Sequence, residues 1–463
     1  MGRLNMLLPM SPTDSMFLIG ESRECPMHVG GLVLFEPPEG GDASDIRDML
    51  DTALARDWVA PQLRRRARRS LGTLGQWGWE TVTDVDLAHH VQHDALPQPG
   101  GMRELMALVS RLHAGLLDRS RPLWEMHLIE GLADGRFAVY MKVHHALADG
   151  ISVMRMLRRA LSTDADARNL RAPWEPGAPR LEVASPVTGT VDFAEAAVRV
   201  VRESVGEVAG LVPALVDTVD RALHGRGGAL TLAAPSSLLN VPIGGARRFA
   251  AGSWSLERLR LVAKCADATV NDVVLAMSSG ALRTFLAGAD ALPGDPLLAL
   301  VPVSLRSEGR SEGGNEIGVL TCNLGTHHAE AADRLAAVRS SMREGKETMR
   351  TRSATQIRAM SALGVAPLAL GMLLGRSLPI RPANVMISNV PGPDVPLYWN
   401  GARMTALYPL SIPVDGQALN ITCTSTDEEI SFGLTACRSL PDLAPMVTHL
   451  DDELALLERA VGL

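Results

Sequence analysis

The stretch that most constrains this chain is FAVYMKVHHALADGIS, which runs from Phe137 to Ser152. Its first part is apolar apart from Lys142 and holds Val, Tyr and Phe, a pattern that predicts a short buried strand. His144 and His145 stand where that strand ends. After an intervening turn, apolar residues recur at helical spacing and predict a helix. They are Ile151, Met154, Leu157 and Leu161.

This placement suits general-base chemistry. A neutral imidazole titrates near working pH and can take a proton from a hydroxyl, and a strand end holds the ring more firmly than a loop does. We therefore expect His145, with His144 beside it, to carry the chemistry. Asp149 is better suited to orient the turn or to pair with an arginine. Gly150 would allow either an unusual backbone geometry or a close ligand approach.

A structural interpretation competes with the catalytic one. Histidine pairs occur by chance, and an aspartate before a helix is a common N-cap residue. In that interpretation, His144 and His145 are surface residues at the end of a strand, and Asp149 caps the following helix. Composition and pattern alone leave both interpretations open.

The residues His144, His145, Asp149 and Gly150 form the pattern HHxxxDG. This pattern resembles the signature of CoA-dependent acyltransferases and of peptide-synthetase condensation domains. Further stretches resemble the bacterial wax ester synthase/diacylglycerol acyltransferase family, occur in that family's order and cover nearly the whole chain. They are SPTDSMFL at Ser11–Leu18, PLWEMHLIEGL at Pro122–Leu132, TVNDVVLAMSSGALR at Thr269–Arg283, VPVSLR at Val301–Arg306, GN at Gly314 and Asn315, and SNVPGP at Ser388–Pro393.

The resemblance implies an α/β (α+β) fold of two chloramphenicol-acetyltransferase-like domains. Each domain would be a mixed sheet flanked by helices, with an active-site tunnel at the domain seam. The family resemblance assigns several further residues to substrate binding along that tunnel. Each also has a structural interpretation, since Trp124 suits a core and Asp14 and the pair at 271–272 suit helix caps. The implied substrate-binding residues are Pro122, Leu123, Trp124, Asn271, Asp272 and Asp14.

The activity implied by the resemblance is acyl-CoA-dependent O-acylation of diacylglycerol, giving triacylglycerol, or of long-chain alcohols, giving wax esters. His145 would deprotonate the alcohol, which attacks the thioester directly. Arg306 is one candidate partner for Asp149. Acyl-CoA would be a co-substrate, with no separate cofactor and no metal. Two alternatives keep the fold: an acyltransferase that uses a carrier-protein thioester or another acceptor, and a non-catalytic lipid-binding protein.

Length and charge limit the other classes of function. The 463 residues are too many for one ordinary core, and we expect an N-terminal domain at 1–162, a linker with an amphipathic helix at 163–245 and a C-terminal domain at 246–463. With a net charge of -7 and only 4% aromatic residues, the chain lacks the basic field and the stacking residues typical of nucleic-acid binding.

Cysteine usage and the N-terminus point to the cytoplasm. The five cysteines are scattered, with no CxxC pair, so they indicate neither a zinc site nor a disulfide framework. A reducing compartment fits this pattern best. The N-terminus lacks the features of a signal peptide. The most apolar run, 362–375, is shorter than a membrane span of about 20 residues, so we interpret it as a buried helix or, alternatively, as an interfacial segment.

Two segments leave room for contact with lipid. The pattern at 191–223 is amphipathic; it predicts a helix packed on the domain seam or, alternatively, one lying on a membrane or lipid droplet. The cluster LRRRARR at 63–69 is typical of a solvated face, although it could also attract lipid headgroups or the phosphates of CoA. Peripheral association with the inner membrane or with droplets is therefore an expectation.

Overall fold

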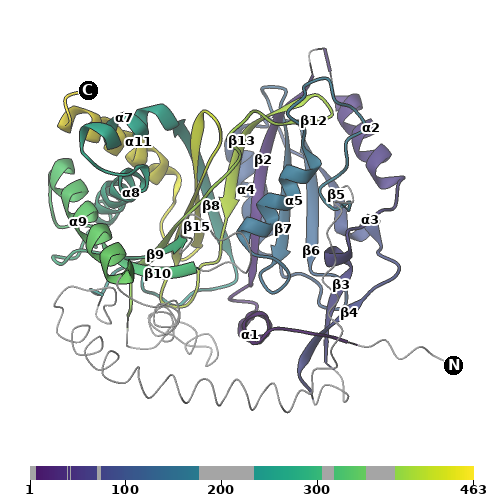
Figure 1. Ribbon diagram of the computed structural model, residues 1–463, viewed down its shortest axis with the longest axis horizontal. Coiled ribbons are helices and arrows are strands. Elements are labelled where there is room, and N and C mark those ends of the chain that lie inside the picture. Colours follow the sequence, from purple (N-terminus) through teal and green to yellow (C-terminus); the bar gives the residue numbers. More distant parts are fainter. Residues whose placement is uncertain are drawn as a thin grey trace.

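Two six-stranded mixed sheets stand side by side and make up most of the molecule (Figure 1). The computed structural model describes residues 7–38, 40–41, 43–69, 75–176, 234–304, 317–350 and 381–463. The predicted fold class is confirmed: helices cover the outer faces of both sheets, and the sheets meet across a central seam. The expected helices at 191–223 and 362–375, and Arg306, lie outside the described residues.

The first sheet has the strand order β12-β13-β2-β7-β6-β5. Alternating or continuous apolar residues form its strands, and β7 is buried along its whole length because helices cover both faces. Helices α2 and α5 pack on one face, around Ile46, Leu50 and Val153. The elements are β2 (His28–Glu36), α2 (Ala43–Leu54), α3 (Leu87–His90), β5 (Val91–Ala95), α4 (Met102–Ala114), β6 (Trp124–Glu130), β7 (Phe137–His144) and α5 (Gly150–Ala160).

The second sheet has the order β10-β9-β11-β14-β15-β8, and helices α7, α8, α9 and α11 cover its outer face. Helix α8 is almost fully buried, which its apolar sequence predicts. The elements are β8 (Arg247–Ser255), α7 (Leu256–Cys265), α8 (Val270–Ala287), β9 (Leu298–Ser304), β10 (Ile317–Asn323), α9 (Ala331–Arg350), β11 (Val385–Val390), β14 (Leu419–Ser425), β15 (Glu429–Cys437) and α11 (Ala444–Ala460).

One strand pair returns from the second half of the chain to the first sheet. The strands β12 (Tyr398–Trp399) and β13 (Ala402–Leu410) follow β11 in sequence, yet β13 pairs antiparallel with β2. A boundary at residue 246 therefore does not separate the two sheets completely, because the C-terminal part supplies one edge of the first sheet.

The seam between the sheets is closely packed. Helix α4 lies between the first sheet and β8, and the Ser110 hydroxyl accepts a hydrogen bond of 2.9 Å from the Phe249 backbone. Strand β13 crosses against β15 at Gly433, where a Cβ would collide with the carbonyl of Pro409. Only glycine allows this approach. The seam is therefore a continuation of the core.

A small third sheet lies beneath the first sheet, beside helix α1 (Figure 1). Its order is β1-β4-β3, and its core is a cluster that includes Ala67, Trp79 and Leu18. The sequence did not predict this sheet. The elements are β1 (Leu8–Pro9), α1 (Pro12–Gly20), the 3-10 helix η1 (Pro61–Arg64), β3 (Arg65–Arg69) and β4 (Trp77–Thr81).

Candidate active site

His145 lies just past the end of β7, as the sequence predicts. Its backbone N–H donates a 2.8 Å hydrogen bond to the carbonyl of Met27. The imidazole is half-buried, and it stacks on the ring of Phe17 with the centroids 4.1 Å apart and the planes 21° apart. The backbone bond fixes the base of the side chain, and the stack fixes the plane of the ring.

The protonation of His145 follows from its surroundings. Burial lowers the pKa of the imidazole below its usual value, and three smaller influences raise it: a hydrogen bond to the residue's own backbone carbonyl and the charges of Asp149 and Asp14. Because burial dominates, the neutral form of His145 predominates at pH 7. A neutral imidazole keeps a lone pair on one ring nitrogen, as a general base requires.

Helix α1 brings Asp14 to this imidazole. Ser11 is the N-cap, and its hydroxyl accepts a 3.0 Å hydrogen bond from the Asp14 backbone. Asp14 is therefore not the N-cap, which was the structural interpretation; it lies in the first turn, three residues before Phe17. Positions three apart share one face of a helix. Both side chains act on His145, one through its ring and one through its charge.

His144 has a different environment. Its ring is fully buried, and Nδ1 accepts a 3.1 Å hydrogen bond from the Ala146 backbone. Its Nε2 lies 3.3 Å from Oε1 of Glu21, in an orientation off the hydrogen-bond direction. Both nitrogens face protein groups, which is the environment expected of a residue that positions the turn. The catalytic role of His144 stays a prediction.

Glu21 connects these parts, although no motif in the sequence indicated it. Oε1 accepts a 3.1 Å hydrogen bond from the Met27 backbone, and Oε2 accepts a 2.9 Å hydrogen bond from Nε of Arg119. Burial raises the pKa of Glu21, but the contacts with His144, Met27 and Arg119 outweigh it, so the pKa lies below its usual value. The carboxylate thus stays charged and ties α1 to the histidine turn.

Asp149 and Gly150 open helix α5. Asp149 is the N-cap, and its Oδ1 accepts a 2.8 Å hydrogen bond from the Ser152 backbone. Asp149 therefore has the capping role of the structural interpretation, and its charge also raises the pKa of His145. Gly150 has no positive φ, and a Cβ built on it meets none of the described atoms within 4 Å. The backbone does not require this glycine, which leaves a close ligand approach as its predicted role.

The PLW residues lie in the core next to the histidine turn. Trp124 is fully buried, its Nε1 donates a 2.9 Å hydrogen bond to the Leu63 carbonyl, and its ring stacks on His90. Leu123 is also fully buried, and its carbonyl accepts a 3.0 Å hydrogen bond from the His144 backbone. Pro122 is buried too. These residues support the turn from the neighbouring strand, and the predicted contact with substrate stays untested.

Asn271 and Asp272 lie at the start of α8, in the second domain. Asp272 forms a capping box with Thr269: its Oδ2 accepts a 2.9 Å hydrogen bond from the Thr269 backbone, and the Thr269 hydroxyl accepts one of 3.2 Å in return. The predicted structural role of Asp272 is thus observed. Among the described residues, no hydrogen bond or ion pair joins Asn271 or Asp272 to the histidine turn.

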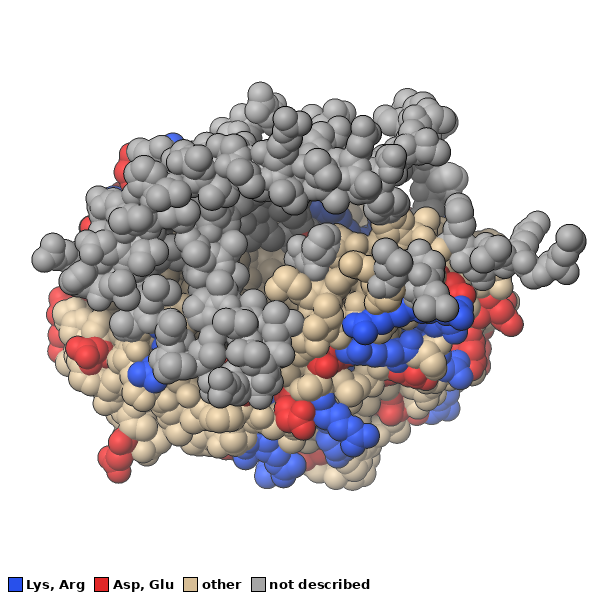
Figure 2. Space-filling model, turned by 90° about the horizontal axis from the view of Figure 1, so that it is seen from below, with Lys and Arg blue, Asp and Glu red and all other residues tan. Residues whose placement is uncertain are grey.

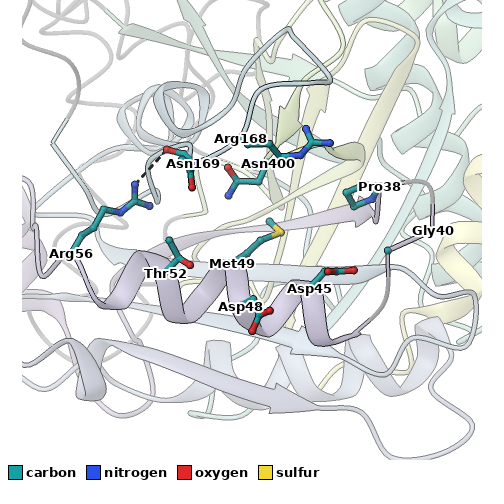
Figure 3. Close-up of a pocket in the computed structure, with 11 residues that line it drawn as sticks. Pro38, Gly40, Asp45, Asp48, Met49, Thr52, Arg56, Arg168, Asn169 and Asn400 are labelled. Carbon is teal, nitrogen blue, oxygen red and sulfur yellow. Dashed lines mark hydrogen bonds between the residues drawn. The ribbon is translucent and has the colours of Figure 1, made fainter.

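A large open pocket lies far from His145 (Figure 3). It has a volume of about 390 Å³ and is lined from α2, the 168–169 segment and the turn at Asn400. Its acidic side chains Asp45 and Asp48 come from one helix face, and Arg56 lies at one end. The pocket lies beyond Glu36, at the end of β2 opposite His28. The nine residues of this strand make eight steps of about 3.3 Å, which separate its two ends by about 26 Å. It contains none of the predicted site residues.

Across the part of the chain that the structure describes, no group of three or more His, Cys, Asp or Glu side chains could hold a metal ion. Within those same ranges, every helix is too short or too polar to cross a bilayer.

Comparison with known proteins identifies the family. The model of the wax ester synthase/diacylglycerol acyltransferase catalytic domain matches residues 10–274, and the model of the WS/DGAT C-terminal domain matches residues 313–458. The chain belongs to the wax ester synthase/diacylglycerol acyltransferase family. It is therefore an acyltransferase, as the HHxxxDG pattern and the ordered motifs predicted.

Relatives of this family member cover it almost end to end. A Mycobacterium tuberculosis protein that bears the provisional name diacylglycerol O-acyltransferase is 53% identical over 460 residues, which are 98% of this chain and 91% of the relative. A second one from the same organism is 47% identical and covers 98% of this chain and 100% of its own length. The family resemblance thus extends over both sheets.

Solved structures agree with this assignment. The wax ester synthase/diacylglycerol acyltransferase from Marinobacter aquaeolei has a TM-score of 0.78 at 38% identity and covers 98% of this chain and 100% of its own. The first condensation domain of the calcium-dependent antibiotic synthetase has a TM-score of 0.58 at 17% identity, covering 98% of this chain and 96% of its own. The second similarity shows a shared fold, as the predicted superfamily requires.

Proposed function

We propose that this acyltransferase moves an acyl group from acyl-CoA to the free hydroxyl of diacylglycerol, and that long-chain alcohols are a second acceptor class. The observation that carries the proposal is the half-buried imidazole of His145, which burial keeps neutral and which the charges of Asp14 and Asp149 influence. The names of the relatives support the acceptor.

The proton and the bonds balance without a covalent enzyme intermediate. The imidazole of His145 takes the hydroxyl proton as the alcohol oxygen attacks the thioester carbonyl. The tetrahedral intermediate then collapses, the C–S bond breaks, and the imidazolium returns the proton to the CoA sulfur. A positioned base of this kind supplies roughly 10²–10⁴-fold of rate. The charges of Asp14 and Asp149 stabilise the imidazolium while it exists.

Three of the five cysteines are poorly suited to act as a nucleophile, which supports direct transfer of the acyl group to the alcohol. Burial raises the pKa of Cys25 and of Cys322 to about 12, and it raises the pKa of Cys423 well above its usual value. These thiols stay protonated at working pH, whereas the thiolate is the reactive form. An acyl-cysteine intermediate at any of these three positions is therefore disfavoured.

Phe17 and the buried turn serve the same chemistry by limiting water. A thioester next to an active base hydrolyses if water reaches it. The stacked ring covers one face of the imidazole, and Leu18, Leu123 and Ala146 pack around the turn. We expect the acyl donor and the alcohol to approach through the predicted tunnel at the seam, where the two domains meet.

The lipid substrates imply a lipid surface. Diacylglycerol and long-chain acyl groups partition into membranes and droplets, so an enzyme that uses them gains by binding there. We propose peripheral association on the cytoplasmic side of the inner membrane or on lipid droplets. The absence of a spanning helix among the described residues agrees with attachment from one side.

CoA release by the purified protein tests the function. Long-chain acyl-CoA with diacylglycerol should give thiol release and triacylglycerol, and His145→Ala should lower kcat by roughly 10²–10⁴-fold. His449→Ala is a matched control, since His449 is also half-buried but lies on α11. A panel of alcohols and a carrier-protein thioester complete the assay. Unchanged turnover in His145→Ala, or transfer only from the carrier protein, would reject the proposal.

A further inference from the structure

Helix α1 has two faces with opposite surroundings. On the inner side, Phe17 stacks on His145, and Leu18 is only 1% exposed. On the outer side, Met16 is 44% and Ile19 is 51% exposed. Leu8, in the strand just before the helix, is 45% exposed. Single exposed apolar side chains are ordinary, but three on adjoining elements form a patch that calls for a partner.

A basic strand accompanies this patch. Strand β3 has the sequence RRARR, and Ala67 is its buried residue. Glu80 pairs with Arg66 at 2.6 Å and with Arg68 at 2.8 Å, and the guanidinium of Arg69 lies 4.4 Å from the Trp77 ring centroid. One glutamate against four arginines leaves this strand positive, although the whole chain has a net charge of -7. Figure 2 shows basic side chains gathered on this lower face, on the side of the first sheet.

The patch, the basic strand and the active site belong to one packed unit. Leu18 of α1, Ala67 of β3, Trp79 of β4 and Ala146 of the histidine turn share one hydrophobic cluster. Figure 1 places α1 and the small sheet together below the first sheet. A surface that binds the outer side of α1 is therefore separated from His145 by little more than the thickness of one helix.

We propose that this face, made of Leu8, Met16, Ile19 and, on β3, Arg65 and Arg69, is the docking site for an anionic lipid surface. Arg65 and Arg69 lie on the strand face of Ala67, whereas Arg66 and Arg68 lie on the opposite face with Glu80. The proposal rests on the proposed function, because it names where the lipid-bound acceptor meets the catalytic imidazole. The apolar side chains enter the acyl boundary, and the guanidinium groups pair with headgroup phosphates. Exposed apolar side chains next to guanidinium groups match both layers of a lipid surface, and the lipid substrates of the proposed function favour that partner over an acidic protein groove or a second copy of the chain.

Vesicle binding of the full chain provides the test. The protein should bind phosphatidylcholine vesicles that contain phosphatidylglycerol, and binding should weaken as salt rises, because exposed charges are screened. Met16→Asp/Ile19→Asp should lower the partition coefficient by roughly tenfold or more, since it places charge where apolar contact is lost. Arg65→Gln/Arg69→Gln should lower it by roughly 25-fold, because each arginine contributes about fivefold and the two factors multiply.

The matched control moves the same change to the other domain. Leu261 on α7 and Leu456 on α11 are 40% and 41% exposed, and Leu261→Asp/Leu456→Asp should keep wild-type binding. Thermal unfolding reports whether each variant folds, and the salt dependence of the wild type needs no variant. Equal binding by the α1 and control variants overturns the proposal, as does wild-type binding that ignores lipid charge. A change of molecular mass in the α1 variant, which indicates a second copy as the partner, also overturns it.

CoA release with a water-soluble alcohol separates this proposal from the function. Loss of transfer to vesicle-borne diacylglycerol, with transfer to the soluble alcohol retained in Met16→Asp/Ile19→Asp, supports docking at this face. If no acceptor gives CoA release while vesicle binding follows the predicted pattern, the function fails and the docking site stands. If deletion of 191–223 abolishes binding and the α1 variant does not change it, the docking site fails and the function stands.

Discussion

The ring of Phe17 lies against the imidazole of His145, with the centroids 4.1 Å apart and the planes 21° from parallel. This contact joins helix α1 to the residue that directly follows β7. The contact accounts for the lowered pKa of His145, because the aromatic face excludes water from the imidazole. It also accounts for the orientation of the imidazole, because stacking holds the two ring planes nearly parallel. The behaviour of the base should therefore depend on α1.

Replacing Phe17 by Ala should move the acid limb of the pH profile upward. Water then reaches His145, the desolvation that lowers its pKa is relieved, and the pKa rises toward its usual value. Since the base form is active, kcat/KM should start to fall at a higher pH than in the wild type. A looser ring should also cost roughly 10–10²-fold in kcat. The Phe17→Leu variant still shields the imidazole from water, so the acid limb of its pH profile should lie where it does in the wild type.

Replacing Asp14 by Asn should move the same limb in the opposite direction. The carboxylate of Asp14 raises the pKa of His145, so its neutral isostere lets that pKa fall, and kcat/KM stays on its plateau to lower pH. Opposite shifts in Phe17→Ala and Asp14→Asn, measured by CoA release over the acid range, identify His145 as the titrating group. Shifts of the same sign would contradict that assignment.

Gly150→Ala separates folding from ligand approach. The φ of Gly150 is ordinary and a Cβ meets no described atom, so alanine at the first helical position should leave the free energy of unfolding unchanged or raise it by about 0.4–1 kcal/mol. If the acyl donor passes close to this backbone, KM for acyl-CoA should rise at the same time. Urea unfolding and steady-state kinetics measure the two effects, and a destabilised variant would refute the first.

Glu21→Gln should lower kcat while changing KM little. The amide keeps the shape of the side chain but loses the charge and one of the two acceptor oxygens. It therefore cannot hold Arg119, His144 and the Met27 backbone, which anchors His145, at the same time. A displaced base costs roughly tenfold or more. Asp118→Asn removes an exposed partner of Arg121 and serves as the control. Equal losses in both variants would mean that Glu21 has no special role.

Two buried histidines should make the protein sensitive to mild acid. Burial lowers the pKa of His113 to about 3 and that of His28 well below its usual value. In the unfolded chain both titrate near about 6.5. The unfolded state therefore binds protons first as the pH falls. The free energy of unfolding keeps its maximum value above about pH 6.5 and declines below that pH, by about 1.4 kcal/mol per pH unit for each histidine.

Urea unfolding at several pH values checks this slope. The variant His113→Gln removes one of the two groups, so its free energy of unfolding should depend less on pH, even if its absolute value is lower. The variant His449→Ala should keep the wild-type slope. A flat profile between about pH 7 and about pH 5 in the wild type would contradict the burial argument.

Local pattern predicted most of the elements, and contacts distant in sequence account for what it missed. The strand at 137–144 and the helix at 150–160 are confirmed, because each has a clear apolar period. Strand β3 was predicted as a solvated basic face, since RRARR has no such period; pairing with β4 makes it a strand. Trp124 was predicted to be a core residue, a residue of the tunnel wall, or both. Its buried indole shows the core role, and contact with substrate stays a prediction.

The site was predicted in part for the same reason. One motif contains His145, Asp149 and Gly150, so the spacing within a single stretch of sequence was enough to group them. Glu21 and Phe17 act on that stretch from more than a hundred residues away, and no pattern within α1 indicates which of its residues will face the histidine turn. Arg119 likewise became recognisable only through its ion pair with Glu21.

The return of β13 to the first sheet sets a condition on biosynthesis. Strand β2 pairs with β7 on one side and with β13 on the other, so an emerging N-terminal half has an open edge until residues 402–410 leave the ribosome. Such an edge can pair with a neighbouring nascent chain. The first sheet is therefore completed only near the end of translation, and neither half of the enzyme can be made alone in its native form.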